Sequence, residues 1–91
     1  MLPVVELQIT SRARQYGYVF WPKSQDNQMR ELLGHADSVE ILFENKMIGK
    51  KRVDWKYRRI SIGPSRTTAL GAQLSSFTLA CDGDRLEIKC K

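Results

Sequence analysis

Basic side chains crowd one stretch of the sequence, and the chemistry that they offer is attraction of negative charge. Between Lys46 and Arg66 the chain places eight Lys and Arg residues against one acid, Asp54. The whole chain carries a formal net charge of +5, so the remainder is slightly acidic. Lysines that guard an edge strand against aggregation would explain one or two of these charges. A cluster of this size repels itself unless a partner neutralises it, which favours a polyanion such as nucleic acid.

We therefore predict a nucleic-acid binding domain that contacts phosphates through a basic strand face, with DNA favoured over RNA. Along residues 50–58 basic side chains alternate with apolar ones, so burial of the apolar set would turn the basic set outward. The apolar set is Val53, Trp55 and Tyr57, and the basic set is Arg52, Lys56 and Arg58. The predicted contacts are Arg12, Arg14, Lys23, Lys50, Lys51, Arg52, Lys56, Arg58, Arg59 and Arg66.

Aromatic residues near the basic stretch leave the type of nucleic acid open. Trp21, Trp55 and Tyr57 are favoured as core residues. If they are exposed beside the basic face, they would instead stack on unpaired bases, which would indicate RNA or single-stranded DNA. Exposure of Trp55 separates the two interpretations.

A second class of function is a protein-interaction module. A small barrel with a basic strand can dock on an acidic partner or pair by strand addition. Such a module would show no affinity for nucleic acid at moderate salt.

Residue types that catalyse reactions or hold metals are sparse. His35 is the single histidine, and the glycines occur singly rather than in a phosphate-binding loop. Cys81 and Cys90 lie on two strands of a predicted hairpin, too far apart along it for a disulfide, so we expect two free, buried thiols. One histidine and two cysteines do not complete a four-ligand zinc site. We predict no enzymatic activity, no cofactor and no metal.

The free cysteines and the N-terminal residues also indicate the cellular compartment. Free thiols are typical of a reducing environment. Residues 1–6 lack the basic start and the apolar stretch of a signal peptide. No apolar run approaches the ~20 residues that a membrane-spanning helix needs. We expect a cytoplasmic protein that does not enter a membrane.

We expect a single domain over residues 1–91. Within it, β-strands must position the basic face. Alternation of apolar and polar residues predicts strands over residues 4–10, 16–21 and 38–44, and a basic strand that resumes after Gly49. A bulge or tight turn is expected near Tyr57–Arg59, because Ile60 and Ile62 take the opposite parity. The clearest hairpin runs over residues 77–90, around Asp82-Gly83.

One short helix is expected over residues 24–33, with Ser24 as its N-cap and Gly34 at its end. Residues 65–75 show no pattern and are predicted to form a loop. These elements together predict a mostly β fold, a small partly open β-barrel with one short α-helix.

Residues 9–44 resemble the AbrB-like swapped-hairpin family of DNA-binding proteins, which belongs to the cradle-loop barrels. The shared pattern is a strand that begins at Gly17 and ends in Pro22, a short helix that closes on Leu33-Gly34, and Asp37-Ser38-Val39 opening the next strand. The resemblance implies a DNA-binding barrel that forms a homodimer. It also implies contacts from Arg12 and Arg14, which precede the strand that begins at Gly17, and from Lys23, which follows the proline.

Two features depart from the family pattern. The segment between Pro22 and Leu32 is about one helical turn longer than is usual. The chain also continues well past Glu44, so one chain could complete a barrel that AbrB-like chains build by exchanging hairpins.

Overall fold

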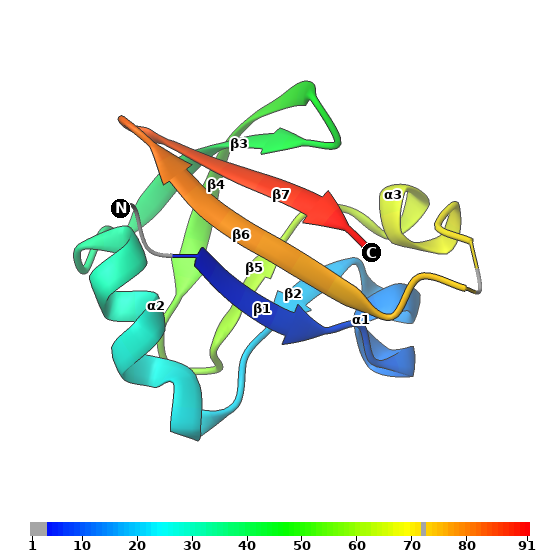
Figure 1. The fold of residues 1–91 in the computed structure, drawn as a ribbon, viewed down its shortest axis with the longest axis horizontal. Coiled ribbons are helices and arrows are strands. Elements are labelled where there is room, and N and C mark those ends of the chain that lie inside the picture. Colours follow the sequence, from blue (N-terminus) through cyan, green and yellow to red (C-terminus); the bar gives the residue numbers. More distant parts are fainter. Residues whose placement is uncertain (1–3, 72) are drawn as a thin grey trace.

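Seven strands form one sheet that curls until its two edge strands approach each other (Figure 1). The computed structural model describes residues 4–71 and 73–91. Strands account for 44% of the structure and helices for 26%, which confirms the predicted small β-barrel. The strands are β1 (Val4–Gln8), β2 (Tyr18–Phe20), β3 (Ser38–Phe43), β4 (Lys46–Asp54), β5 (Arg59–Ser61), β6 (Ser76–Asp82) and β7 (Arg85–Cys90). Their order across the sheet is β1-β6-β7-β3-β4-β5-β2, and among these described strands β3 and β7 are the pair that runs parallel.

Side-chain alternation gives the barrel one continuous apolar core. The β6–β7 hairpin supplies Phe77, Leu79, Leu86 and Ile88, all fully buried. The predicted hairpin is confirmed, but its two-residue turn is Gly83-Asp84 rather than Asp82-Gly83, because Asp82 still pairs with Arg85 at the end of β6. The rest of the core comes from Val5, Leu7, Val19, Trp21, Met29, Leu32, Leu33, Val39, Ile41, Phe43, Val53, Ile60 and Ile62.

The two cysteines lie at opposite ends of this hairpin, and both are free, as predicted. Cys81 pairs with Leu86, and Cys90 pairs with Phe77. Their side chains are half-buried against the core rather than fully buried, because the ends of the hairpin extend past the centre of the barrel.

Within the residues that the structure describes, three α-helices occur where the sequence predicts one. They are α1 (Ser11–Tyr16), α2 (Asp26–Leu33) and α3 (Pro64–Thr68), and the 3₁₀ turn η1 (Lys23–Gln25) precedes α2. Capping stabilises α1: the Thr10 side chain accepts a hydrogen bond from the Ala13 N–H at 3.1 Å, and Gly17 ends the helix in the left-handed conformation. Helix α3 begins with a proline at its first position and replaces part of the predicted loop.

The predicted helix starts later than expected. Ser24 lies within η1, and Gln25 occupies the N-cap position of α2 without a capping hydrogen bond from its side chain. Helix α2 covers one end of the barrel, and α1 and α3 lie together at the other end (Figure 1). Within the described ranges, no helix has the length and apolarity needed to cross a bilayer.

The basic strand begins and ends earlier than expected, which corrects the prediction of a strand that resumes after Gly49 and continues through Arg58: β4 already starts at Lys46 and includes Gly49. Strand β4 ends at Asp54, and residues 55–58 form a turn in which the Asp54 carboxylate accepts a hydrogen bond from the Tyr57 N–H at 3.0 Å. Arg58 adopts a positive φ of 55°, and the chain reverses into β5. A turn near Tyr57–Arg59 is thus confirmed, but it places Tyr57 outside the core, 58% exposed.

Candidate nucleic-acid interface

The outer surface of strands β2, β5 and β4 brings cations and aromatic rings together. A row of paired residues across these strands, Val19, Ile60 and Val53, is buried. Successive side chains alternate between the two faces of a strand, so the neighbouring positions point outward. These outward positions are Tyr18 and Phe20 on β2, Arg59 and Ser61 on β5, and Arg52 and Asp54 on β4.

Two adjoining segments extend this surface. Helix α1 contributes Arg12 and Tyr16, and the turn between β4 and β5 contributes Lys56 and Tyr57. We call the combined surface the aromatic–cation face. Its members are Arg12, Tyr16, Tyr18, Phe20, Arg52, Lys56, Tyr57 and Arg59.

Arg59 occupies the centre of the aromatic–cation face. Its guanidinium carbon lies 4.6 Å from the ring centroid of Tyr18 and 5.0 Å from that of Tyr57. Its Nε atom lies 3.5 Å from a carboxylate oxygen of Asp54. The carboxylate and the two rings together hold the guanidinium in place.

The rings continue on either side of Arg59. Tyr18 meets Phe20 edge to face, with centroids 5.3 Å apart, and stacks with Tyr16 at 6.3 Å. The Arg12 guanidinium lies 5.8 Å from the Phe20 centroid. The Lys56 amine lies 5.5 Å from the Tyr57 centroid. The face is therefore a row of three rings, Tyr16, Tyr18 and Phe20, which Arg59 connects to a fourth ring, Tyr57, and a cation lies beside three of the four.

The aromatic–cation face is open to solvent and positive. Tyr57 is 58% and Tyr16 is 50% exposed, and Tyr18 and Phe20 are half-buried. Four cations stand against one carboxylate, that of Asp54. A hollow of about 170 Å³ lies between Tyr18, Arg52 and Arg59. Such a concentration of positive charge raises the local concentration of anions.

Both tryptophans point away from this face. Trp21 is buried, and its indole N–H donates a hydrogen bond to Asp26 at 2.8 Å. Trp55 is half-buried and packs edge to face on Trp21, and its N–H donates to the Ala36 carbonyl at 2.8 Å. The interpretation as core residues is thus correct for Trp21, nearly so for Trp55 and wrong for Tyr57. Because Trp55 is not exposed beside the basic residues, it does not support the base-stacking interpretation, and the exposed ring in this region is that of Tyr57.

Three of the predicted contact residues are engaged inside the protein. Arg14 is half-buried and donates hydrogen bonds to the carbonyls of Leu70, Gly71 and Leu74. Arg58 pairs with the Asp26 carboxylate through its Nε atom at 3.0 Å, and Arg66 donates to the Ile62 carbonyl at 3.0 Å. These interactions hold the three arginines against loops and helix ends, so fewer of their N–H groups remain to bind phosphates.

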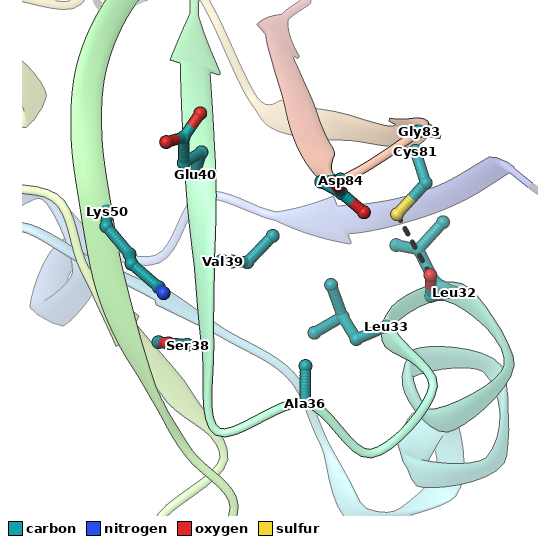
Figure 2. Close-up of a pocket in the computed structure, with 10 residues that line it drawn as sticks. All are labelled: Leu32, Leu33, Ala36, Ser38, Val39, Glu40, Lys50, Cys81, Gly83 and Asp84. Carbon is teal, nitrogen blue, oxygen red and sulfur yellow. Dashed lines mark hydrogen bonds between the residues drawn. The ribbon is translucent and has the colours of Figure 1, made fainter.

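The remaining predicted residues lie outside the aromatic–cation face. Lys23 is exposed on η1, and Lys51 is half-buried opposite Val39. Lys50 is exposed and lines a hollow of about 450 Å³ beside the end of α2 (Figure 2). Of the ten predicted residues, Arg12, Arg52, Lys56 and Arg59 lie together on the face.

The hollow in Figure 2 is poorly suited to a polyanion. Its floor is apolar, with Leu33 and Val39, and its rim carries the carboxylates of Glu40 and Asp84 against the single amine of Lys50. The Cys81 thiol donates a hydrogen bond to the Leu32 carbonyl at 2.9 Å. Two carboxylates against one amine would repel phosphate groups.

The thiols are poor nucleophiles. Partial burial raises the pKa of Cys81. Burial and the neighbouring Glu44 carboxylate raise the pKa of Cys90 to about 12. The thiolate is the reactive form, so neither side chain is activated at neutral pH. Across residues 4–71 and 73–91, no three His, Cys, Asp or Glu side chains gather in a group that could hold a metal ion.

Comparison with protein families, with curated proteins and with solved structures finds no match to this chain. The chemistry of the aromatic–cation face is therefore the main guide to function.

Sequence reasoning found the cations of this face but missed Tyr16, Tyr18 and Phe20. A signal for two of them is present in the order of residues 18–21. Val19 and Trp21 are the residues that the core needs, so the alternate positions, Tyr18 and Phe20, must face solvent. Tyr16 had no such signal, because it lies on a helix where a strand was predicted.

Proposed function

We propose that the chain binds nucleic acid through the aromatic–cation face. The observation that carries this proposal is the grouping of four cations on one outer surface with a single carboxylate. Lys and Arg side chains of this kind contact phosphate oxygens, and a bidentate guanidinium such as that of Arg52 suits them well. Neutralisation of the cations by phosphates also removes their mutual repulsion.

Resemblance to AbrB-type proteins agrees with this proposal but remains a prediction, as does the homodimer that it implies. Cations on strands and on the helix before β2 are the kind of contact expected from that resemblance. Arg12 fits it, whereas Arg14 is held by carbonyl groups.

The region between the two edge strands of the barrel favours a second candidate function, a module that binds an extended peptide by strand addition. Strands β1 and β2 are the two edges of the sheet. A groove of about 710 Å³ lies between them, lined by Gln8 on one side and by Phe20 and Pro22 on the other. An added strand could pair with either edge.

The test is a fluorescence titration of labelled duplex and single strands of about 12 nucleotides over a range of salt concentrations. The wild-type chain should bind at low salt, and its affinity should fall as salt rises. Arg52→Gln combined with Lys56→Gln should lower the slope of log affinity against log salt by about 1.4–1.8, because two phosphate contacts are lost. Both side chains are exposed, so the fold should be unchanged.

The matched control is Arg85→Gln combined with Lys89→Gln. It removes the same charge from exposed positions of β7, which β3 and β4 separate from β5. This variant should keep the wild-type slope. Absence of binding to any nucleic acid at low salt would reject the proposal in favour of the peptide-binding module, and an equal loss of slope in both variants would reject the aromatic–cation face as the site.

A further inference from the structure

We infer that the nucleic acid bound by the aromatic–cation face is single-stranded, with unpaired bases stacked on its tyrosine and phenylalanine rings. This inference rests on the proposed function and adds the class of ligand. It comes from the position of the rings, which share one surface with the phosphate-binding cations rather than lying in a separate patch.

The aromatic rings would contribute little to the binding of a duplex. In a duplex the faces of the bases are covered by their neighbours in the stack, and a protein surface reaches only their edges and the phosphates. Unpaired bases expose their faces, and aromatic side chains bind those faces without regard to sequence. Tyr57 holds ring surface open to solvent beside Lys56 and Arg59, and Tyr16 is exposed next to Tyr18, so backbone and base can be bound at once.

Arginine contacts set the rings in place before any ligand arrives. Arg59 lies between Tyr18 and Tyr57, and Arg12 covers Phe20. Ordered side chains lose less conformational entropy on binding, so this packing favours association. The guanidinium planes are themselves surfaces on which bases can stack.

The residues around the rings also favour binding that does not depend on the nucleotide sequence. Apart from Ser61 and the Asp54 carboxylate, which is paired with Arg59, the outward positions of β2, β4 and β5 near the rings are cations or aromatic. Few groups remain to read base edges by hydrogen bonding. We therefore expect binding that tolerates different sequences and depends on stacking and salt.

The experiment compares oligo(dT), oligo(U) and a mixed-sequence duplex of the same length, about 12 nucleotides, as ligands of the full chain. Oligo(dT) and oligo(U) should each bind more tightly than the duplex, and their ratio distinguishes DNA from RNA as the source. Tyr57→Leu should weaken single-strand binding about five-fold or more while the salt slope is unchanged, because a stacking contact is lost and no phosphate contact is.

Tyr57→Phe is the matched control, since it keeps the ring and removes only the hydroxyl group. It should bind as the wild type does. Tyr57 is exposed in a turn, so both variants should fold, and Tyr16→Leu provides a second ring removal at another exposed position.

The outcomes separate the two proposals. Equal affinity for duplex and single strands, with Tyr57→Leu and Tyr16→Leu neutral, would overturn the single-strand inference and leave nucleic-acid binding intact. Failure of all three ligands to bind at low salt would overturn the proposed function and this inference with it.

Discussion

Asp26 links the start of α2 to the turn that carries Tyr57. Its carboxylate accepts hydrogen bonds from the Trp21 indole N–H at 2.8 Å and from Arg58 Nε at 3.0 and 3.1 Å. Partial burial acts to raise the pKa of Asp26, but these hydrogen bonds and the charges of Arg58 and Arg30 outweigh it and hold the pKa below the ordinary value of 3.8. The contact also turns Arg58 away from the aromatic–cation face.

This carboxylate should make the folded state sensitive to acid. A lowered pKa in the folded state means that unfolding takes up a proton as the pH falls below 3.8, so the stabilisation is complete above that pH and is lost below it. Urea unfolding of Asp26→Asn should give a smaller free energy of unfolding than the wild type at pH 7. The gap should narrow as the pH falls below 3.8 and the wild-type carboxyl takes up its proton, and a gap that stays constant would contradict the expectation.

At the scale of elements, Gly17 joins α1, β2 and the start of α3. It has a φ of 74°, and its carbonyl accepts hydrogen bonds from the N–H groups of Ile62 and Gly63. A Cβ atom at this position would lie 2.2 Å from the Gly63 carbonyl carbon. Glycine is therefore required both by the backbone conformation and by the close approach of another segment.

Gly17→Ala should lower the free energy of unfolding by more than the ~1–2 kcal/mol that a positive φ costs an L-residue. Gly34→Ala is the matched control, because Gly34 has a φ of 60° and no atom lies within 4 Å of its Cβ position. Thermal or urea unfolding of both variants measures the difference, which is the cost of the steric overlap. Equal losses of unfolding free energy in the two variants would show that small backbone shifts relieve the overlap between residues 17 and 63.

Alternation predicted most of the sheet because it is a local signal tied to burial. The β6–β7 hairpin and its free cysteines follow from the residues themselves, although the turn lies one residue later than predicted. The end of β4 does not, because the alternation of basic and apolar residues continues past Asp54, and the turn depends on Asp54 and on the distant pair Arg58–Asp26. Helices α1 and α3 lack a wide apolar stripe and depend on caps and on contact with each other.

The residues of the candidate site also differ in how far the sequence predicts them. Charge is visible in a sequence, so Arg12, Arg52, Lys56 and Arg59 were found. Which cations stay free depends on tertiary structure: carbonyl groups hold Arg14 and Arg66, and Asp26 holds Arg58. The aromatic half of the face depends on strand register, which decides that Tyr18 pairs with Ser61 and Phe20 with Arg59.

At the scale of the whole molecule, the last two strands complete both the sheet and the core. Strand β1 pairs only with β6, and β3 pairs with β7. Phe77, Leu79, Leu86 and Ile88 fill the centre of the barrel. The aromatic–cation face lies on the opposite part of the sheet, so its strands depend on this hairpin indirectly, through the shared core.

A chain that ends at residue 75 should therefore show no cooperative unfolding transition. It loses four fully buried side chains and the pairing partner of β1, and the remaining apolar surface is too small for an isolated core. Fluorescence of the two tryptophans, Trp21 and Trp55, during urea titration is the measurement, with the full chain as the reference. A sharp transition in the shortened chain would show that β2–β5 and the helices form an independent unit.

The pairing of Val4 with Ala80 also constrains how the protein comes into being. On the ribosome the first strand emerges long before the strand that will cover it, and Val5 and Leu7 remain in contact with water during that interval. Such high contact order slows folding and leaves the nascent chain open to aggregation until β6 has been synthesised. The basic middle of the chain is synthesised during that interval, and its mutual repulsion would help to keep unfinished copies apart.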